Sequence, residues 1–119
     1  MRGSKYKNKK ITVDNTVFDS EAEYKYYIFL KLRQNAGDIS ELKTQVTFPL
    51  NITGADGKIY KISKYIADFT YLDKNGKLNV EDVKNPVLAK GAAFRLKFKL
   101  MLALHGVEIN IVSPKLLRI

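Results

Sequence analysis

Two aspartates stand inside segments whose other residues favour β-strands. Asp68 lies in the run KIYKISKYIADFTYLD, and Asp82 lies in LNVEDVK. The dipeptide Asn75-Gly76 between these segments predicts a tight hairpin turn, and counting outward from it places residue 68 opposite a position near 82. Cross-strand neighbours have Cβ atoms about 5 Å apart. Because a carboxylate in a strand interior is costly unless it is paired or bound to a metal, the two aspartates are candidate ligands of one cation.

A lysine follows Asp82 at a spacing that keeps it on the same face of the strand. Side chains alternate along a strand, so Val80, Asp82 and Lys84 share one face, and Glu81 is expected to lie outside the site. Mg²⁺ prefers oxygen ligands and lowers the pKa of a bound water, which favours phosphodiester hydrolysis. Lys84 would orient or deprotonate that water, or stabilise the transition state as a cation. The alternative is an ordinary solvated strand face, because an Asp-x-Lys triplet alone is very common.

The composition indicates a basic globular chain that binds a polyanion. Its 119 residues fit one domain, and 21 Lys and Arg against 12 Asp and Glu give a formal charge of +9, which implies a polyanionic partner such as nucleic acid or an anionic membrane surface. The chain has no Cys and a single His, His105, which excludes cysteine nucleophiles, cysteine-ligated zinc and disulfide scaffolds. No apolar run is long enough to cross a membrane, and no signal peptide is recognisable, so we expect a cytoplasmic protein.

The first ten residues differ in composition from the rest of the chain. Residues 1–10 are rich in Lys and Arg and contain no acid, which predicts a flexible basic arm, with a merely solvated tail as the alternative. Residues 11–119 predict a single domain. A protein that binds membrane surfaces or acidic proteins through the arm would explain the charge but not the aspartates on strands.

The remaining patterns predict an α/β (α+β) fold with a mixed central sheet flanked by helices. Ser20 is a suitable helix N-cap, and Gly37 and Gly106 stand where two helices should end. The last strand follows a helix, so it is expected to run parallel to an earlier strand. The expected elements are a hairpin over 11–18, a helix over 20–35, a strand over 42–50, a turn over 54–57, a strand over 58–73, a turn over 73–77, a strand over 78–84, a helix over 89–105 and a strand over 107–113.

The first helix also carries an acid near its start. Ser20-x-x-Glu23 has the pattern of a capping box, in which the glutamate reaches back to the backbone N–H of Ser20. On this pattern alone, capping is the favoured role of Glu23.

The combination of Glu23 on a helix, Asp68 on a strand and Asp82-Val83-Lys84 on the next strand resembles the signature of the PD-(D/E)XK nuclease superfamily. The expected element order is also similar to the αβββαβ core of these restriction-endonuclease-like proteins. Several segments further resemble a small phage-encoded endonuclease family: KYKNKKITVDNTVFDSEAEYKYY, TQVTF, YIADFTY, VEDVKN and FRLKFKL. The proline of the superfamily motif is absent, and Ala67 precedes Asp68 instead.

The resemblance implies a role for each matched residue. It makes Asp68, Asp82 and Glu23 ligands of Mg²⁺ or Mn²⁺, with Glu21 as the alternative helix-borne acid. The Val83 carbonyl would be a further ligand, and Lys84 would be the catalytic lysine. Gln45 matches a polar residue near the site, and Lys97 matches a basic residue that faces DNA. With the basic residues of the arm and of the second helix, the expected DNA-binding set is Lys5, Lys7, Lys9, Lys10, Arg95, Lys97, Lys99 and Gln45.

The function implied by the resemblance is metal-dependent cleavage of DNA in phage replication, recombination or packaging. A small chain has little surface for reading bases, which favours recognition of branched or junction DNA by shape. Cutting both strands of a duplex needs two active sites, which favours a homodimer. The alternative is a non-catalytic nucleic-acid-binding module that has kept the fold and the charge.

Overall fold

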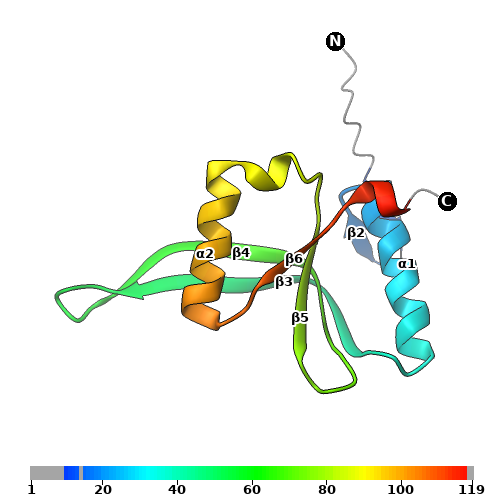
Figure 1. The fold of residues 1–119 in the computed structure, drawn as a ribbon, viewed down its shortest axis with the longest axis horizontal. Helices are drawn as coiled ribbons and strands as arrows, with labels where there is room; N and C mark the ends of the chain where they lie inside the picture. Colours follow the sequence, from blue (N-terminus) through cyan, green and yellow to red (C-terminus); the bar gives the residue numbers. More distant parts are fainter. Residues whose placement is uncertain (1–9, 14, 118–119) are drawn as a thin grey trace, which may run out of the picture.

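The computed structural model describes residues 10–13 and 15–117 of the chain. The order of its main elements, α1, β3, β4, β5, α2 and β6, confirms the predicted αβββαβ order (Figure 1). None of the helices in this part of the chain has the length and apolar character needed to cross a membrane. The strands are β1 (Ile11–Val13), β2 (Thr16–Phe18), β3 (Ser40–Thr53), β4 (Ile59–Leu72), β5 (Leu78–Val83) and β6 (Ile109–Val112), and the helices are α1 (Glu21–Asn35), α2 (Ala92–His105) and the short 3₁₀ helices η1 (Leu88–Lys90) and η2 (Pro114–Leu117).

The strands form two sheets. β1 and β2 pair as an antiparallel hairpin, and β3, β4, β5 and β6 form a sheet in that order. All neighbours in the larger sheet are antiparallel except β5 and β6, which are parallel. The parallel pair follows from the crossover through α2, which returns the chain to the same end of the sheet. The sheet is therefore mixed, as the sequence predicted.

The turn between β4 and β5 fixes the register that matters for the site. Asp73 Oδ1 accepts hydrogen bonds from the backbone N–H groups of Asn75 (2.9 Å) and Lys77 (3.0 Å). Gly76 has a φ of 77°, a conformation that glycine adopts at little cost. The pairing that follows places Phe69 opposite Glu81. Continuing this register by one residue brings Asp68 opposite Asp82.

The two helices cover opposite faces of the larger sheet. Along β5, Val80 belongs to the core that contains Met101 of α2, whereas Val83 packs against the core that contains Leu30 of α1. β6 is also divided between the cores. Ile109 and Ile111 pack in the core that contains Met101, and Val112 packs against the core that contains Leu30. A strand buried on both faces is typical of the centre of an α/β sheet.

The ribbon of β3 and β4 bends at Asp68. Ala67 and Phe69 have the same parity on β4, yet Ala67 packs in the core under α2 and Phe69 packs in the core under α1. Gln45, which lies opposite Asp68 in the β3–β4 register, has a φ of 54°. A non-glycine residue in the left-handed region redirects the backbone of a strand. The bend therefore places Asp68 at the junction of the two cores.

Two boundaries differ from the sequence-based expectation. Helix α2 begins at Ala92 rather than at residue 89, because Leu88–Lys90 forms a 3₁₀ turn and Gly91 is extended (φ −65°, ψ 149°). Strand β3 is longer at both ends than the predicted 42–50, because its pairing with β4 continues through register shifts at both ends of the segment. The predicted turn over 54–57 lies between these longer strands, which end at Thr53 and begin at Ile59.

Candidate active site

Three acidic side chains from three elements come together between the two cores. Glu23 in the first turn of α1 is 4% exposed, Asp82 on β5 is 8% exposed, and Asp68 on β4 is half-buried. Asp68 Oδ2 accepts a hydrogen bond from the backbone N–H of Val83 (2.8 Å), which ties β4 to β5 beyond the last paired residues. The carboxylates of Glu23 and Asp82 are both close enough to Asp68 to raise its pKa.

Asp68 is the acid least able to carry charge. Burial raises its pKa to about 9, and the hydrogen bond to Asp82, the charge of Asp82 and the charge of Glu23 add to the effect of burial. The N–H of Val83 acts in the opposite direction. A cation bound beside Asp68 would favour its charged form and offset the effect of burial.

Glu23 is oriented by two contacts of different kinds. Its backbone N–H donates to Ser20 Oγ (3.1 Å), so Ser20 caps the helix as predicted. Its carboxylate Oε1 accepts from Gln45 Nε2 (3.0 Å), so the side chain is directed toward the strands. Burial, together with the charges of Asp19 and Asp82, raises the pKa of Glu23 to about 7. Among the described residues, no hydrogen bond joins the Ser20 N–H to the Glu23 carboxylate, so the capping role favoured for this side chain is not observed, and the carboxylate faces the acidic cluster instead.

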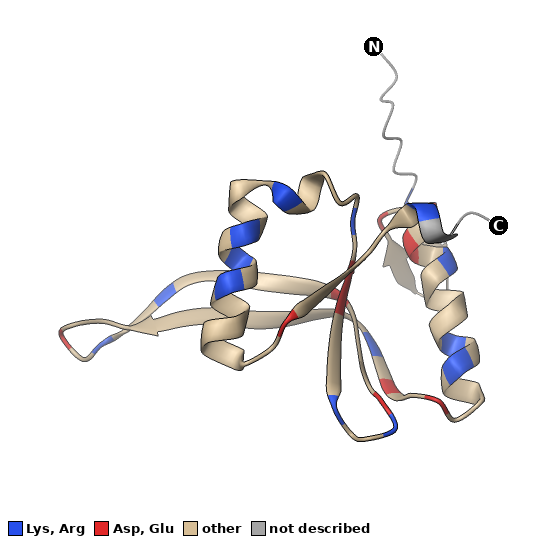
Figure 2. Ribbon diagram, in the orientation of Figure 1, with Lys and Arg blue, Asp and Glu red and all other residues tan. Residues whose placement is uncertain are grey.

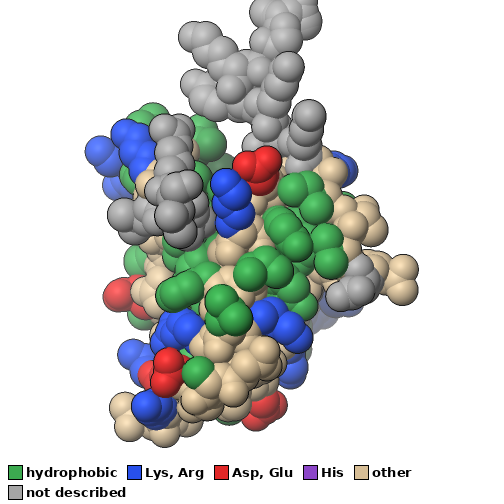
Figure 3. Space-filling view, turned by 90° about the vertical axis from the view of Figure 1, so that its right-hand side faces the viewer, with side chains coloured by type: hydrophobic (Ala, Val, Ile, Leu, Met, Phe, Trp, Pro, Cys, Tyr) green, Lys and Arg blue, Asp and Glu red, His purple; other side chains and the backbone are tan. Residues whose placement is uncertain are grey.

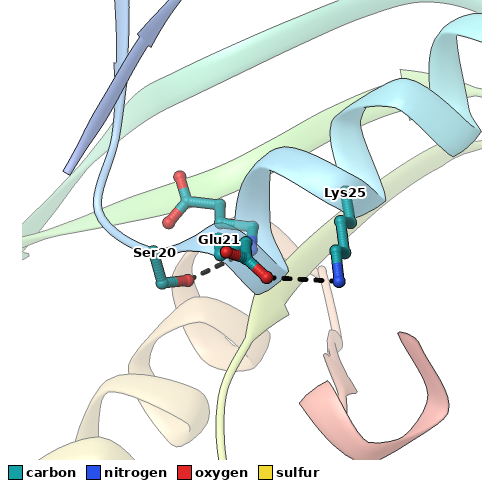
Figure 4. Close-up of polar contacts among 4 residues, drawn as sticks. Ser20, Glu21 and Lys25 are labelled. Atoms are coloured by element: carbon teal, nitrogen blue, oxygen red, sulfur yellow. Dashed lines mark hydrogen bonds and ion pairs between the residues drawn. The ribbon is translucent and has the colours of Figure 1, made fainter. Parts of the chain in front are cut away.

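Glu21, the alternative helix-borne acid, lies outside this cluster. Its Oε1 atom is 3.2 Å from Lys25 Nζ, and both side chains are largely exposed (Figure 4). The structure therefore places Glu23, and not Glu21, beside the two aspartates.

Asp82 has a hydroxyl partner that the sequence did not predict. The hydroxyl of Tyr65, which is buried on β4, donates to Asp82 Oδ2 (3.0 Å). Burial raises the pKa of Tyr65, and the charge of Asp82 and this hydrogen bond add to the increase, so the tyrosine remains a donor. The sequence places Tyr65 and Tyr71 on the same predicted strand as Asp68. Their positions did not reveal which acid each hydroxyl contacts.

Lys84 continues the strand that carries Asp82. Its backbone N–H donates to Val112 O (3.0 Å), which extends the contact between β5 and β6. Its Nζ atom lies 4.9 Å from the centroid of the Phe94 ring, at the start of α2. Within residues 10–13 and 15–117, no ion pair involves Lys84, Glu23, Asp68 or Asp82.

The donor set fits a hard divalent cation in its chemistry, although the side chains are not arrayed around one point. In the described part of the chain, no group of three or more His, Cys, Asp and Glu side chains converges closely enough to hold an ion. Instead, each carboxylate has a protein partner: Gln45 for Glu23, Val83 for Asp68 and Tyr65 for Asp82. Buried carboxylates without a cationic partner are costly, and a bound cation removes that cost.

The remaining predicted DNA-binding residues are distributed over the surface. Lys5, Lys7 and Lys9 lie outside the described residues, and Lys10 is exposed. Arg95 and Lys99 are exposed on α2 and line a surface hollow of about 220 Å³ together with Phe94 and Phe98. Lys97 is half-buried on the same helix. Figure 2 shows the basic bands along α2 and the acidic residues of the sheet beside it.

Glu81 lies on the other face of β5, as the alternation predicted, but it is buried and not solvated. It accepts hydrogen bonds from Tyr26 (2.5 Å) and Tyr71 (2.9 Å). Burial and the contact with Glu81 together raise the pKa of both tyrosines, that of Tyr71 to about 12. This second acidic group anchors β5 to α1 and fixes the strand on which Asp82 lies. No local pattern could predict it, since Tyr26 and Glu81 are 55 residues apart.

The chain matches the family described as "Protein of unknown function (DUF1064)" over residues 3–113, and it belongs to that family. No curated protein and no solved structure matches the chain significantly.

Proposed function

We propose that this DUF1064 protein is a divalent-metal-dependent DNA endonuclease that hydrolyses phosphodiester bonds. The observation that supports it most is the cluster of Glu23, Asp68 and Asp82 between two cores, with no basic side chain paired to it among the described residues. A fold gains nothing in stability from uncompensated buried acids, so their presence favours a functional role. The resemblance of these residues and of Lys84 to the PD-(D/E)XK signature points to the same chemistry.

Each residue of the site has a distinct role in this proposal. Glu23, Asp68 and Asp82 hold Mg²⁺ or Mn²⁺ through carboxylate oxygens, and the Val83 carbonyl is a further ligand. When bound, the ion supplies Lewis-acid chemistry at the scissile phosphate and lowers the pKa of water. Lys84, which has no acidic partner in the described structure, stabilises the negative charge that grows on the phosphate.

Two neighbours hold the ligands in position. Gln45 fixes the Glu23 carboxylate and Tyr65 fixes the Asp82 carboxylate, each through one hydrogen bond. Partners of this kind commonly change metal affinity when they are removed.

The charge of the chain supports DNA as the substrate. A formal charge of +9 favours a polyanion, and the small surface favours recognition of branched or junction DNA by shape. The proposed setting is phage DNA processing in the host cytoplasm.

The direct test is cleavage of supercoiled plasmid and of branched DNA with Mg²⁺, with Mn²⁺ and with EDTA. We expect metal-dependent cleavage by the wild type and loss of at least two orders of magnitude in rate for Asp82→Asn and Lys84→Ala. Asp38→Asn is the matched control, because Asp38 is a partly exposed acid between α1 and β3 whose carboxylate pairs with Lys74 (3.5 Å). Cleavage that survives either site substitution would falsify the assignment.

The second candidate is a non-catalytic nucleic-acid-binding module. It is favoured by one observation, namely that no three acidic side chains of the described residues converge on a common point. This function predicts salt-dependent DNA binding, no cleavage with any metal, and tighter binding for Asp82→Asn because a negative charge near phosphate is removed. The cleavage assay and a binding assay on the same variants therefore separate the two functions.

A further inference from the structure

The ribbon of β3 and β4 presents one face that no other described element covers. Alternate residues of a strand share a face, and so do cross-strand partners. The alternate residues 47, 49, 51 and 53 of β3 therefore share a face with their partners on β4. The resulting outer face consists of Thr47, Pro49, Asn51 and Thr53 on β3 and Ile66, Lys64, Lys61 and Ile59 on β4. Lys64 and Lys61 are three residues apart, and the register shift between Leu50 and Asn51 is what pairs both with the same face of β3.

The two faces of this ribbon have different surroundings. Leu50 and Tyr65 point to the inner face and are buried in the core that includes Met101 of α2. The residues of the outer face are exposed, apart from the half-buried Asn51, and Ile59 near the tip is 70% exposed. Figure 1 shows the ribbon continuing past α2 and away from the body of the molecule. The outer face is thus available to a partner along its whole length.

The charge on the outer face selects the kind of partner. It contains two lysines and no acidic residue, and neither Lys61 nor Lys64 has an acidic partner among the described residues. The whole chain carries a formal charge of +9, so a second copy would bring further positive charge to this face. A polyanion is complementary to the face, and like-charge repulsion disfavours self-association through it.

The outer face has no aromatic side chains, which favours double-stranded over single-stranded nucleic acid as its partner. Proteins that bind single strands stack the bases on aromatic rings, and the nearby Tyr60 lies on the inner face with its partner Ile52. A two-stranded ribbon has dimensions that fit the major groove of a duplex. At about 3.3 Å per residue, Lys64 and Lys61 lie roughly 13 Å and 23 Å along β4 from Asp68, which is less than one turn of a duplex.

We propose that the outer face of the β3–β4 ribbon binds duplex DNA flanking the phosphate that is cleaved, with Lys61 and Lys64 contacting the DNA backbone. This inference rests on the proposed function for the position of the cleaved phosphate. The ribbon itself acts as a binding surface with or without cleavage. It adds two residues to the DNA-binding surface that the sequence pattern on α2 and in the arm did not indicate.

The experiment is a titration of labelled DNA in EDTA at several salt concentrations. The variants are Lys61→Gln/Lys64→Gln and, as a matched control, Lys74→Gln/Lys77→Gln on the exposed turn between β4 and β5. A lysine that contacts phosphate contributes about one to the slope of log K against log salt, so the ribbon variant should lower the slope by about two. The control variant should keep the wild-type slope. Binding of the ribbon variant to the matching single strand should fall less than its binding to the duplex.

The outcomes of this titration are decisive in both directions. Equal slopes for the ribbon variant and the control, or an equal loss on single strands and duplex, would overturn the inference. A change of solution mass in the ribbon variant without a change in DNA affinity would also overturn it, since the face would then join two copies. Recovery of the wild-type slope by Lys61→Arg/Lys64→Arg would support it.

Failure of the inference and failure of the proposed function give different results. Metal-dependent cleavage together with unchanged binding by the ribbon variant would leave the endonuclease assignment standing without the ribbon. Ribbon-dependent duplex binding without cleavage by any metal would leave the binding surface standing without the endonuclease.

Discussion

The carboxyl groups of Asp68 and Glu23 are neutralised more easily in this fold than in water. Burial and neighbouring acids raise their pKa values to about 9 and about 7. A carboxyl group whose pKa is raised in the folded state stabilises the fold fully only below its ordinary pKa of about 4. This contribution is lost as the pH rises through the two raised values. The metal-free protein should therefore lose stability between about pH 4 and pH 9.

The first prediction concerns Asp68→Asn, which removes the charge and retains an oxygen for the Val83 N–H. In EDTA at pH 8, we expect this variant to be more stable than the wild type by about 1–3 kcal/mol, the desolvation penalty of a buried polar group, because the amide cannot ionise. Its unfolding free energy should also depend less on pH. Urea denaturation at pH 5 and pH 8 measures both effects. Asp38→Asn serves as the surface control, and equal behaviour of the two variants would contradict the prediction.

The second prediction concerns Tyr65→Phe, which deletes the hydroxyl that donates to Asp82. Loss of such a partner typically lowers metal affinity by about 10–100-fold. We expect calorimetry with Mn²⁺ to show a decrease in this range, while DNA binding in EDTA remains at the wild-type level. The matched control is Tyr60→Phe, since Tyr60 is exposed near the tip of the ribbon and its hydroxyl bonds to Asp56. A control variant that loses as much metal affinity would show that the hydroxyl of Tyr65 has no special role.

At the scale of elements, β3 contributes to the site through an unfavourable backbone conformation. Glu41 and Gln45 have φ values of 52° and 54°, both in the left-handed region. A side chain there costs roughly 1–2 kcal/mol, of which replacement by glycine recovers part. Glu41 lies at a register shift of the strand, whereas Gln45 lies opposite Asp68 and donates to Glu23. The same conformation thus shapes the strand at one position and aims a side chain into the site at the other.

The third prediction compares glycine substitutions at these two positions. We expect Glu41→Gly to stabilise the fold by about 0.5–1 kcal/mol through relief of the backbone, with activity unchanged. Gln45→Gly gains the same relief but leaves Glu23 without its amide donor, so it should lower metal affinity and cleavage. Thermal denaturation and the plasmid assay measure the two effects. Equal activity of the two variants would show that Gln45 does not position Glu23.

Local signals predicted most of the elements, because each depends on residues close together in the chain. Ser20 caps α1, and Gly76 takes the conformation that the turn between β4 and β5 requires. The register from that turn was enough to bring Asp68 and Asp82 to neighbouring positions. Alternation along β5 was also enough to separate Glu81 from Asp82.

The features that the sequence did not reveal depend on contacts between distant segments. The bend at Asp68 divides Ala67 and Phe69 between two cores, and nothing in the alternation of β4 indicates it. The hydroxyl partners of Glu81 and Asp82 depend on how β4, β5 and α1 pack together. Local propensity therefore predicted that Asp68 and Asp82 lie side by side, and tertiary packing determined their hydrogen-bond partners.

At the scale of the whole molecule, two exposed surfaces differ in charge. The outer face of the ribbon carries lysines without acids, whereas the outer side of α1 carries the Glu21–Lys25 ion pair beside the exposed side chains of Ile28, Phe29 and Leu32. Figure 3 shows hydrophobic side chains gathered on the face of the molecule that carries α1. A charge-balanced apolar face can meet its own copy across a two-fold axis, which suits the pair of active sites that double-strand cutting needs.

The last prediction is that the protein forms a homodimer through this side of α1. Light scattering should show a mass that increases with concentration for the wild type and remains monomeric for Leu32→Glu, because a buried unpaired charge at an apolar interface is costly. Leu96→Glu is the matched control, since Leu96 on α2 is about as exposed (58% against 62%) but lies outside this face. The dimer should convert supercoiled plasmid directly to the linear form, and Leu32→Glu should accumulate the nicked form. A wild type that is monomeric at every concentration, or a control variant that is monomeric as well, would contradict the dimer prediction, and an endonuclease of this fold would then make its two cuts in successive encounters of single molecules with the DNA.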